Sequence, residues 1–319
     1  MAVQEELKKI ILGLLPQVDC VIGWGPGPDL LCASPYFMRR PEEVDNFLAG
    51  PMATQNTALY LPEYKGKKVA LVVKGCDSRS VAQLLAEKLI AREEVRIIGF
   101  PCAGVADMGK IAARLAPHGE PGEAEKAVYG EKELRITMAG RELVLPLAEI
   151  KADKCLRCAH PNAVFSDHFA GEKAAGNDDE FKDLAALETM SLEDRFSFWE
   201  KEMSRCVRCY ACRNACPLCV CRDHCVASSR DPHWLTQADG VSDKLLFQVT
   251  HALHLAGRCT GCGECQRACP AGIPVLLLKR ALSRAVEGLF GHSAGLDPET
   301  RPPLLTFQVE ERTIKEKAW

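Results

Sequence analysis

The chain has 319 residues, which is long enough for two domains and at least one sizeable hydrophobic core. With 47% hydrophobic and 26% charged residues, its composition is that of a globular protein and excludes the disordered and collagen-like classes. Lys and Arg number 40 against 43 Asp and Glu, and the formal charge of -3 argues against nucleic acid or an anionic membrane as a partner.

Cysteine is the unusual component, with 17 residues in the chain. No apolar run reaches the roughly 18 to 20 residues of a membrane-spanning helix. Residues Met1–Glu6 also lack the basic segment that begins an export signal. We therefore expect a cytoplasmic protein without a membrane span. Because disulfides are rare in that compartment, metal ligation is the expected use of the thiols.

The first predicted element is an amphipathic helix that ends near Pro16. Its apolar residues follow the i, i+3, i+4, i+7 spacing of one helix face: Leu7, Ile10, Ile11, Leu14 and Leu15. Residues Gly23–Pro28 are rich in Gly and Pro and predict a loop. We expect no nucleotide site there, because a dinucleotide fingerprint needs a strand before the glycines and a helix after them.

A β-α-β unit is predicted next. Val69–Val73 is an apolar run typical of a buried strand, helical spacing follows, and Val95–Phe100 is a second strand. A right-handed crossover makes the two strands parallel, so their carboxyl ends lie at one edge of the sheet. Cys76 and Cys102 each follow such an end, and we expect the two thiols to converge there.

The following segment predicts a hairpin over residues 135–146, which leads to Cys155 and Cys158. Residues 171–190 are polar and acidic, and we interpret them as a linker between two domains.

Three helices are expected after the linker. Ser191 and Asp194 are spaced as a capping box for a helix that runs towards Arg205. A second helix is predicted over 241–256, and Pro274 suits the first position of a third.

Two cysteine runs share the spacing C-x2-C-x2-C-x3-C-P. The first comprises Cys206, Cys209, Cys212 and Cys216 before Pro217, and the second Cys259, Cys262, Cys265 and Cys269 before Pro270. This spacing is the bacterial ferredoxin signature for two 4Fe-4S clusters, in which the fourth cysteine of each run ligates the other cluster. We therefore expect one cluster on Cys206, Cys209, Cys212 and Cys269, and the other on Cys259, Cys262, Cys265 and Cys216. A zinc site, the alternative, typically uses C-x2-C pairs separated by a longer loop.

The long segment between the two runs resembles the helical ferredoxin domains of heterodisulfide reductase and of succinate dehydrogenase iron-sulfur subunits. The alternative is a small β-rich ferredoxin that carries an insertion.

Four stretches resemble the beta-subunit family of deazaflavin (coenzyme F420)-dependent hydrogenases and dehydrogenases: Val73–Arg79, Gly99–Val105, Asp153–Cys158 and Arg205–Arg213. The last stretch resembles members fused to a dicluster ferredoxin. The resemblance implies a third 4Fe-4S cluster on Cys76, Cys102, Cys155 and Cys158. Buried reduced thiols or a zinc site remain the alternatives. True beta subunits of the family also carry a flavin, but no flavin motif is matched here residue by residue.

Several remaining residues have two interpretations each. Cys219, Cys221 and Cys225 could form a further metal site, completed by His224, Cys20 or Cys32, or they could be bystander thiols. His251 and His254 are spaced as a metal pair on one helix face, or as structural histidines. Five arginines flank the cluster motifs, where they could tune the clusters, dock a partner or face solvent: Arg205, Arg208, Arg213, Arg258 and Arg267.

The sequence thus predicts an α/β domain with a parallel βαβ unit, plus a mostly α-helical dicluster ferredoxin domain. The expected divisions are an α/β domain with a cluster site at 1–170, a linker at 171–190, the ferredoxin domain at 191–290 and a tail at 291–319. The expected function is electron relay within an anaerobic redox complex, with subunits of a hydrogenase, formate dehydrogenase or heterodisulfide-reductase-like enzyme as partners. The alternative is a flavin-dependent oxidoreductase that reduces a deazaflavin or nicotinamide cofactor.

Overall fold

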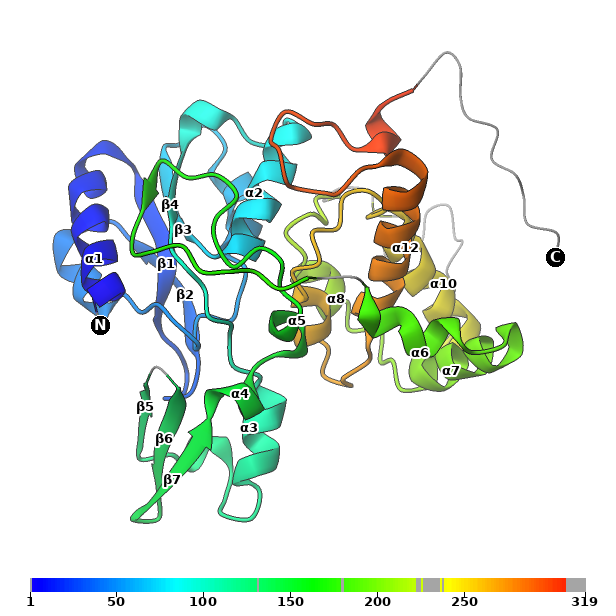
Figure 1. The fold of residues 1–319 in the computed structure, drawn as a ribbon, viewed down its shortest axis with the longest axis horizontal. Helices are drawn as coiled ribbons and strands as arrows, with labels where there is room; N and C mark the ends of the chain where they lie inside the picture. Colours follow the sequence, from blue (N-terminus) through cyan, green and yellow to red (C-terminus); the bar gives the residue numbers. More distant parts are fainter. Residues whose placement is uncertain are drawn as a thin grey trace.

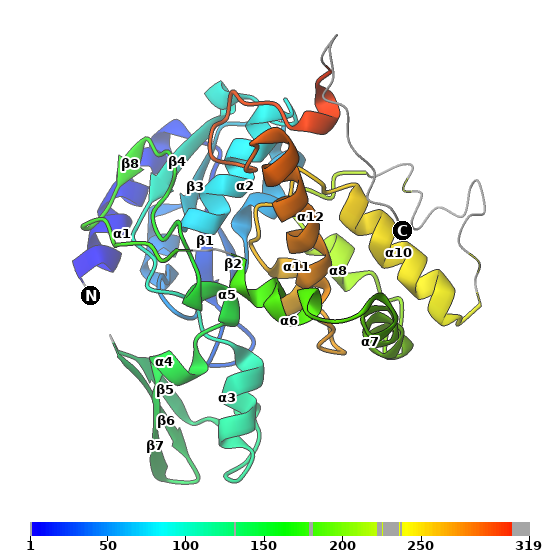
Figure 2. The same cartoon turned by 45° about the vertical axis from the view of Figure 1, so that its right-hand side comes forward.

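The computed structural model describes residues 2–130, 132–178, 181–221, 225, 236 and 238–307. The chain forms an α/β half around a five-stranded sheet, a small lobe with a three-stranded sheet, and a helical half (Figure 1). In both cartoon views α5, Asp153–Leu156, lies where these three parts meet (Figure 2). Within the described ranges, no helix is long and apolar enough to cross a membrane.

The larger sheet has the strand order β2-β1-β3-β4-β8. The strands are β1 Cys20–Pro26, β2 Ala33–Met38, β3 Val69–Val73, β4 Val95–Gly99 and β8 His168–Phe169. Only β2 pairs antiparallel with its neighbour. Helix α2, Gly75–Ala86, connects β3 to β4, and Val69 pairs with Val95 in parallel register. The predicted β-α-β unit is therefore confirmed.

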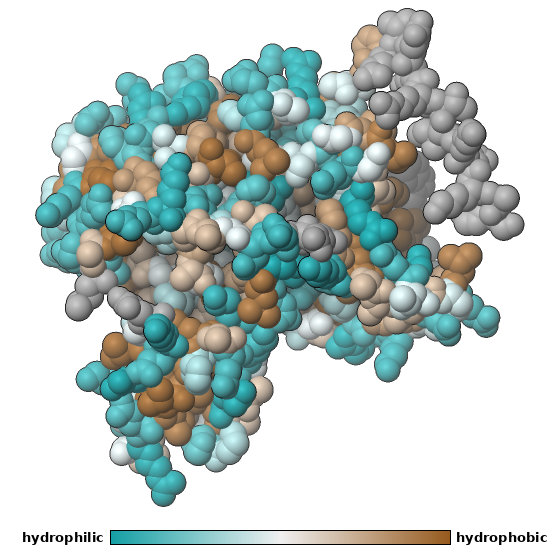
Figure 3. Space-filling view, in the orientation of Figure 1, coloured by the Kyte–Doolittle hydropathy of each residue, from teal (hydrophilic) through white to brown (hydrophobic). Residues whose placement is uncertain are grey.

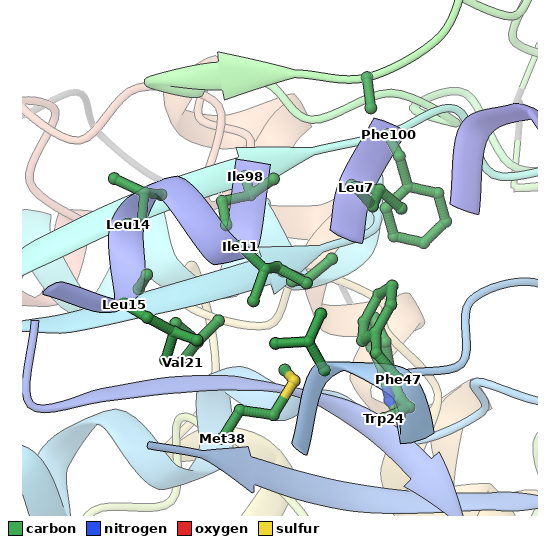
Figure 4. Close-up of a cluster of buried hydrophobic side chains, with 14 of the residues drawn as sticks. Leu7, Ile11, Leu14, Leu15, Val21, Trp24, Met38, Phe47, Ile98 and Phe100 are labelled. Carbon is green, nitrogen blue, oxygen red and sulfur yellow. The ribbon is translucent and has the colours of Figure 1, made fainter. Parts of the chain in front are cut away.

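One face of this sheet is covered by α1, Ala2–Leu14. Figure 4 shows Leu7 of α1 beside Phe100 and Ile11 of α1 near Ile98 of the sheet. The predicted opening helix is confirmed, because its apolar stripe supplies this core. Val81 and Leu84 of α2 pack on the opposite face.

Residues of the helical half also pack on the α2 face of the sheet: Cys216, Leu218 and Leu255. The two halves therefore share one hydrophobic core, and burial of apolar area holds them together.

The predicted loop at Gly23–Pro28 is wrong in part, because residues through Pro26 belong to β1. A Cβ atom at Gly23 would lie 2.8 Å from Phe47 Cε2, and one at Gly25 would lie 2.7 Å from Tyr36 Cγ. The glycines therefore make room for aromatic rings that pack over the strand, a role that turn statistics alone do not reveal.

The small lobe is inserted between β4 and β8. Its sheet has the order β5-β6-β7, with β5 Lys126–Tyr129, β6 Glu133–Met138 and β7 Arg141–Pro146. The helices of the lobe are α3 Met108–Leu115 and α4 Leu147–Ile150. The predicted hairpin is confirmed as β6–β7, whereas β5 was not predicted. Figure 3 shows apolar surface on this lobe, where Val128 and Val144 are about half exposed.

The described residues from 181 to 307 form helices and loops without a strand. The helices are α6 Ala185–Glu188, α7 Leu192–Ser204, α8 Ala211–Asn214, α10 Val241–Leu253, α11 Glu264–Arg267 and α12 Val275–Phe290. Short 3-10 helices occur at Leu15–Gln17, Pro41–Asn46, Thr57–Tyr64, Arg92–Glu94, Pro121–Glu123, Lys182–Leu184 and Pro303–Leu305.

The predicted helix starts after the linker are close to those observed. The backbone N–H of Asp194 donates to Ser191 Oγ over 3.0 Å, which confirms the predicted cap of α7. Pro274 lies at the N-cap of α12, one residue before the position predicted for it.

The segment 171–190 is less open than its composition indicates. Its helix α6 contributes Leu187 to the core of the helical half. Asp183 forms ion pairs with Arg157, at 3.2 Å, and with Arg280, at 2.6 Å. The segment is therefore packed against both halves of the chain.

We predict that Ile11→Ala lowers the free energy of unfolding by about 2–5 kcal/mol, because Ile11 is fully buried beneath α1 and its loss leaves a cavity. The control Leu12→Ala changes a neighbouring side chain that is 43% exposed and is expected to alter stability by no more than about 0.5 kcal/mol. Urea unfolding followed by circular dichroism measures both. Equal midpoints for the two variants would contradict the observed packing of α1.

Candidate metal centres

Four cysteines line one cavity of about 460 Å³ where the α/β half meets the helical half. Cys76 is the second residue of α2, Cys102 follows β4, Cys155 lies in α5 and Cys158 comes just after it. We call these four residues the sheet-edge set. The structure thus brings Cys76 and Cys102 together at the carboxyl ends of β3 and β4, where the sequence places them.

Close backbone contacts hold the sheet-edge set in place. A Cβ atom on Gly75 would lie 1.7 Å from the carbonyl oxygen of His160, so this position has no room for a side chain. The N–H of Cys102 donates to the carbonyl of Pro161 over 2.9 Å. The N–H of Val105 points at the sulfur of Cys155, 3.4 Å away. Loop 158–161 is therefore fixed against both strand ends.

A second group of thiols surrounds a small cavity of about 20 Å³ in the helical half. We call it the outer set, and it consists of Cys206, Cys209, Cys212 and Cys269. Arg208 and Tyr210 have φ values of 49° and 59°, in the left-handed region, which bends the loop around the cavity. Cys209 is exposed to solvent, whereas Cys206 and Cys212 are buried.

The third group, the inner set, consists of Cys216, Cys259, Cys262 and Cys265. Cys216 comes from the first run, and the sulfurs of Cys259, Cys262 and Cys265 are all close enough to act on its charge. The structure therefore brings the fourth cysteine of each run beside the first three of the other, as the crossed ferredoxin pattern predicts. Cys259 also lines the 460 Å³ cavity of the sheet-edge set.

Across the described ranges, no three Cys, His, Asp or Glu side chains converge on the position of a single metal ion. Burial raises the pKa of Cys102 to about 11 and that of Cys262 to about 12. Such thiols are protonated near neutral pH, so a metal that binds them must displace their protons.

Lys279 of α12 carries a buried ammonium group that has no hydrogen-bond partner among the described residues. Burial disfavours its charge, but nearby sulfurs outweigh this effect and raise the pKa of Lys279. These sulfurs belong to Cys265, Cys259 and Cys216 of the inner set and to Cys212 of the outer set. A buried cation at this place requires anionic groups around it, and thiolates of the inner and outer sets would supply them.

Lys154 occupies a comparable position between the sheet-edge and inner sets. Its Nζ donates to the carbonyl of Cys262 and lies 3.8 Å from the carboxylate of Glu264. Burial disfavours the charge, but the sulfurs of Cys76 and Cys262 and the Glu264 carboxylate raise the pKa of Lys154 overall. The residue before Cys155 thus bridges two cysteine sets.

A polar stripe on α2, which was not predicted from the sequence, joins the two halves. Ser80 and Gln83 are buried, and Ser80 Oγ lies 3.1 Å from Thr260 Oγ1. Glu87, farther along the same face, accepts a 2.7 Å hydrogen bond from Arg258. The i, i+3, i+7 spacing of these polar residues is the only signal available in the sequence, and it is equally typical of a solvated helix face.

The five arginines near the motifs are all held by acceptors of this chain. Arg267 pairs with Glu264 and Arg258 with Glu87, while the other three donate to backbone carbonyls: Arg205 to Ala271, Arg208 to Thr236 and Arg213 to Cys221.

The remaining thiols separate into two groups. Cys20 lies in the core of the α/β half, and Cys32 has its thiol 3.8 Å from Asp29 Oδ2. In contrast, Cys219, Cys221 and Cys225 line a common cavity with His251 and His254. His224 lies outside the described residues. Burial lowers the pKa of His251 to about 3, so its imidazole is neutral.

We predict that Gly75→Ala destabilises the protein by about 1–3 kcal/mol, because the new methyl group forces loop 158–161 away from α2. Gly288→Ala in α12 is the matched control, because no atom lies within 4 Å of its added methyl group. That substitution is expected to be neutral or to stabilise the helix by about 0.5–1 kcal/mol. Thermal unfolding under anaerobic conditions measures both, and a neutral Gly75→Ala variant would contradict the described contact.

Comparison with known proteins identifies two regions. Residues 66–217 match the family described as the C terminus of the coenzyme F420 hydrogenase/dehydrogenase beta subunit, and residues 202–273 match the 4Fe-4S dicluster domain. The F420-dependent formate dehydrogenase subunit beta of Methanocaldococcus jannaschii is 24% identical over 352 residues, which cover 92% of this chain and 90% of the relative. The F420-dependent formate dehydrogenase 1 subunit beta of Methanococcus maripaludis is 23% identical over 348 residues, with 90% and 89% covered.

Among solved structures, a chain of the F420-reducing [NiFe] hydrogenase complex from Methanosarcina barkeri aligns with a TM-score of 0.41 and 12% identity. The alignment covers 63% of this chain and 86% of that one. The family and domain matches confirm the resemblance predicted from the cysteine motifs. The chain is thus similar to the C terminus of the coenzyme F420 hydrogenase/dehydrogenase beta subunit over residues 66–217 and to a 4Fe-4S dicluster domain over residues 202–273.

Proposed function

We propose that this protein is an electron-transfer subunit that relays single electrons between 4Fe-4S clusters within a multi-subunit anaerobic redox complex. The observation that carries the proposal is the continuity of the three cysteine sets. Cys259 of the inner set lines the sheet-edge cavity, and Lys279 lies among sulfurs of the inner and outer sets. A series of adjacent redox centres suits relay, whereas a single isolated site does not.

Each set supplies four thiolates to one cluster in this proposal. The clusters supply reversible one-electron oxidation and reduction. The protein's own residues bury the thiolates, and they place cations beside them: Lys154 between the first two sets and Lys279 between the last two. Such cations favour the more negative, reduced form of a nearby cluster and so raise its reduction potential.

The proposal divides the chain by role. Residues 1–170 form the α/β part with the sheet-edge site, 171–190 connect the halves, and 191–290 form a helical dicluster ferredoxin domain. Relatives named as formate dehydrogenase beta subunits support a partner of the formate dehydrogenase or hydrogenase kind, or a heterodisulfide-reductase-like one. The partner would donate electrons at one end of the series or accept them at the other.

The size of the sheet-edge cavity favours one second candidate function. About 460 Å³ lies within the range of small-molecule sites, roughly 300–1,000 Å³, so the cavity has room for part of an organic cofactor. The candidate is a flavin-dependent oxidoreductase that reduces a deazaflavin or nicotinamide cofactor. Flavin bound stoichiometrically to the anaerobically purified chain, with cofactor-dependent dye reduction, would favour this candidate over the relay.

We predict that Cys76→Ser removes about four iron and four acid-labile sulfide per chain, because it breaks the four-thiolate set of one cubane. Cys32→Ser is the control, since Cys32 is half-buried beside Asp29 and belongs to none of the three sets. Iron and sulfide are measured on anaerobically purified protein. An unchanged iron content in Cys76→Ser would remove the sheet-edge cluster from the proposal.

We also predict that Lys279→Met lowers the reduction potentials of the inner and outer clusters and leaves that of the sheet-edge cluster unchanged. The variant keeps the length of the side chain but removes the cation that lies among four sulfurs. Lys244→Met is the control, because that buried ammonium is paired with Asp239 at 2.7 Å. Potentiometric titration followed by electron paramagnetic resonance distinguishes the variants, and equal shifts in both would refute the role of Lys279.

A further inference from the structure

Three thiols that the relay does not use lie together in the helical half. Cys219, Cys221 and Cys225 follow the first ferredoxin run with the spacing C-x-C-x3-C. They line a cavity of about 20 Å³ that α10 closes on one side with His251. The cavity that the outer set surrounds has the same volume.

His251 is the second observation that indicates a ligand. Its side chain is 3% exposed, and neither ring nitrogen has a hydrogen-bond partner in the part of the chain that the structure describes. The ring stacks on Phe247 at a centroid distance of 5.8 Å, which holds its orientation. A buried polar group without a partner costs free energy, and a metal bound to one ring nitrogen of the neutral imidazole removes that cost.

Two cations also face this cavity. Arg213 and Arg258 both line it, and Nε of Arg213 is buried without a partner among the described residues. The guanidinium of Arg213 donates to the carbonyl of Cys221 over 2.7 Å. Positive side chains at this place would offset the negative charge of a thiolate-ligated centre.

We propose that Cys219, Cys221, Cys225 and His251 ligate a fourth metal centre, an iron-sulfur cluster. Three soft thiolates and one imidazole form a donor set that iron-sulfur clusters and zinc prefer. Its position beside the inner set favours the cluster. The N–H of Cys219 donates to the carbonyl of Cys216 over 3.1 Å, so the new centre adjoins the inner set. The inference does not depend on the relay, because ligation can be measured without a redox partner.

The first test measures iron, sulfide and zinc in the anaerobically purified full chain. With the new centre we expect about sixteen iron per chain instead of the about twelve of three cubanes. The double variant Cys219→Ser/Cys221→Ser is expected to lose about four iron and four sulfide, while Cys32→Ser loses none. Adding Cys216→Ser to the double variant should remove about four more iron per chain, because Cys216 belongs to the inner set. If the triple variant loses no more iron than the double variant, the iron lost from the double variant comes from the inner set, and the proposal is overturned.

The second test keeps the thiols and changes the imidazole. His251→Cys is expected to retain all the iron and to lower the reduction potential of one cluster, followed by its electron paramagnetic resonance signal. The reason is that histidine ligation raises the potential of a cluster relative to full thiolate ligation. His118→Gln, at an exposed histidine that follows α3 in the small lobe, is the control and should leave every signal unchanged.

Three results would overturn the proposal. They are an iron content that the double variant does not change, loss of about one zinc per chain in place of iron, and a His251→Cys protein whose potentials equal those of the wild type. The same measurements on Cys76→Ser report on the sheet-edge site separately, so the two proposals can fail independently.

Discussion

The ion pair between Arg258 and Glu87 determines how the two cysteine-bearing halves meet. Arg258 immediately precedes Cys259, and its guanidinium donates to Glu87, the C-cap of α2, over 2.7 Å and to the carbonyl of Leu218 over 3.1 Å. One largely buried side chain therefore positions both segments that contribute to the inner set and connects them to α2. A charge that is largely removed from water is stabilised only while its partner stays in place, so the halves form one unit.

Much of the α/β half follows from its sequence. The apolar run of β3 is best buried as an inner strand, and the apolar stripe of α1 is best buried against the sheet. The hydrophobic periodicity was therefore enough to predict both elements. Gly23 and Gly25 misled the prediction, because the aromatic rings that cover them come from distant residues, Phe47 and Tyr36. The strand β5 was missed because its pairing with β6, rather than a strong apolar run of its own, defines it.

The cysteines of the candidate sites were predicted, but the polar residues around them were not. Cysteine spacing predicted the inner and outer sets, and the β-α-β unit together with the family resemblance implied the sheet-edge set. The fold brings the members of each set together. Spacing could not reveal Lys154, Lys279 or the polar stripe of α2, because a lysine or serine on a helix face has the same pattern whether it meets water or a neighbouring domain. Their burial depends on contacts over more than 100 residues, such as that between Ser80 and Thr260.

The exposure of Cys209 gives the series of centres a vulnerable end. The inner cysteines Cys216, Cys262 and Cys265 are buried, whereas Cys209 lies open beside Val207, which is 69% exposed. On the proposed assignment, dissolved oxygen reaches the outer cluster before the inner one, and oxidative damage passes from the outer cluster inwards. A partner subunit that covers this surface would therefore protect the clusters as well as exchange electrons with them.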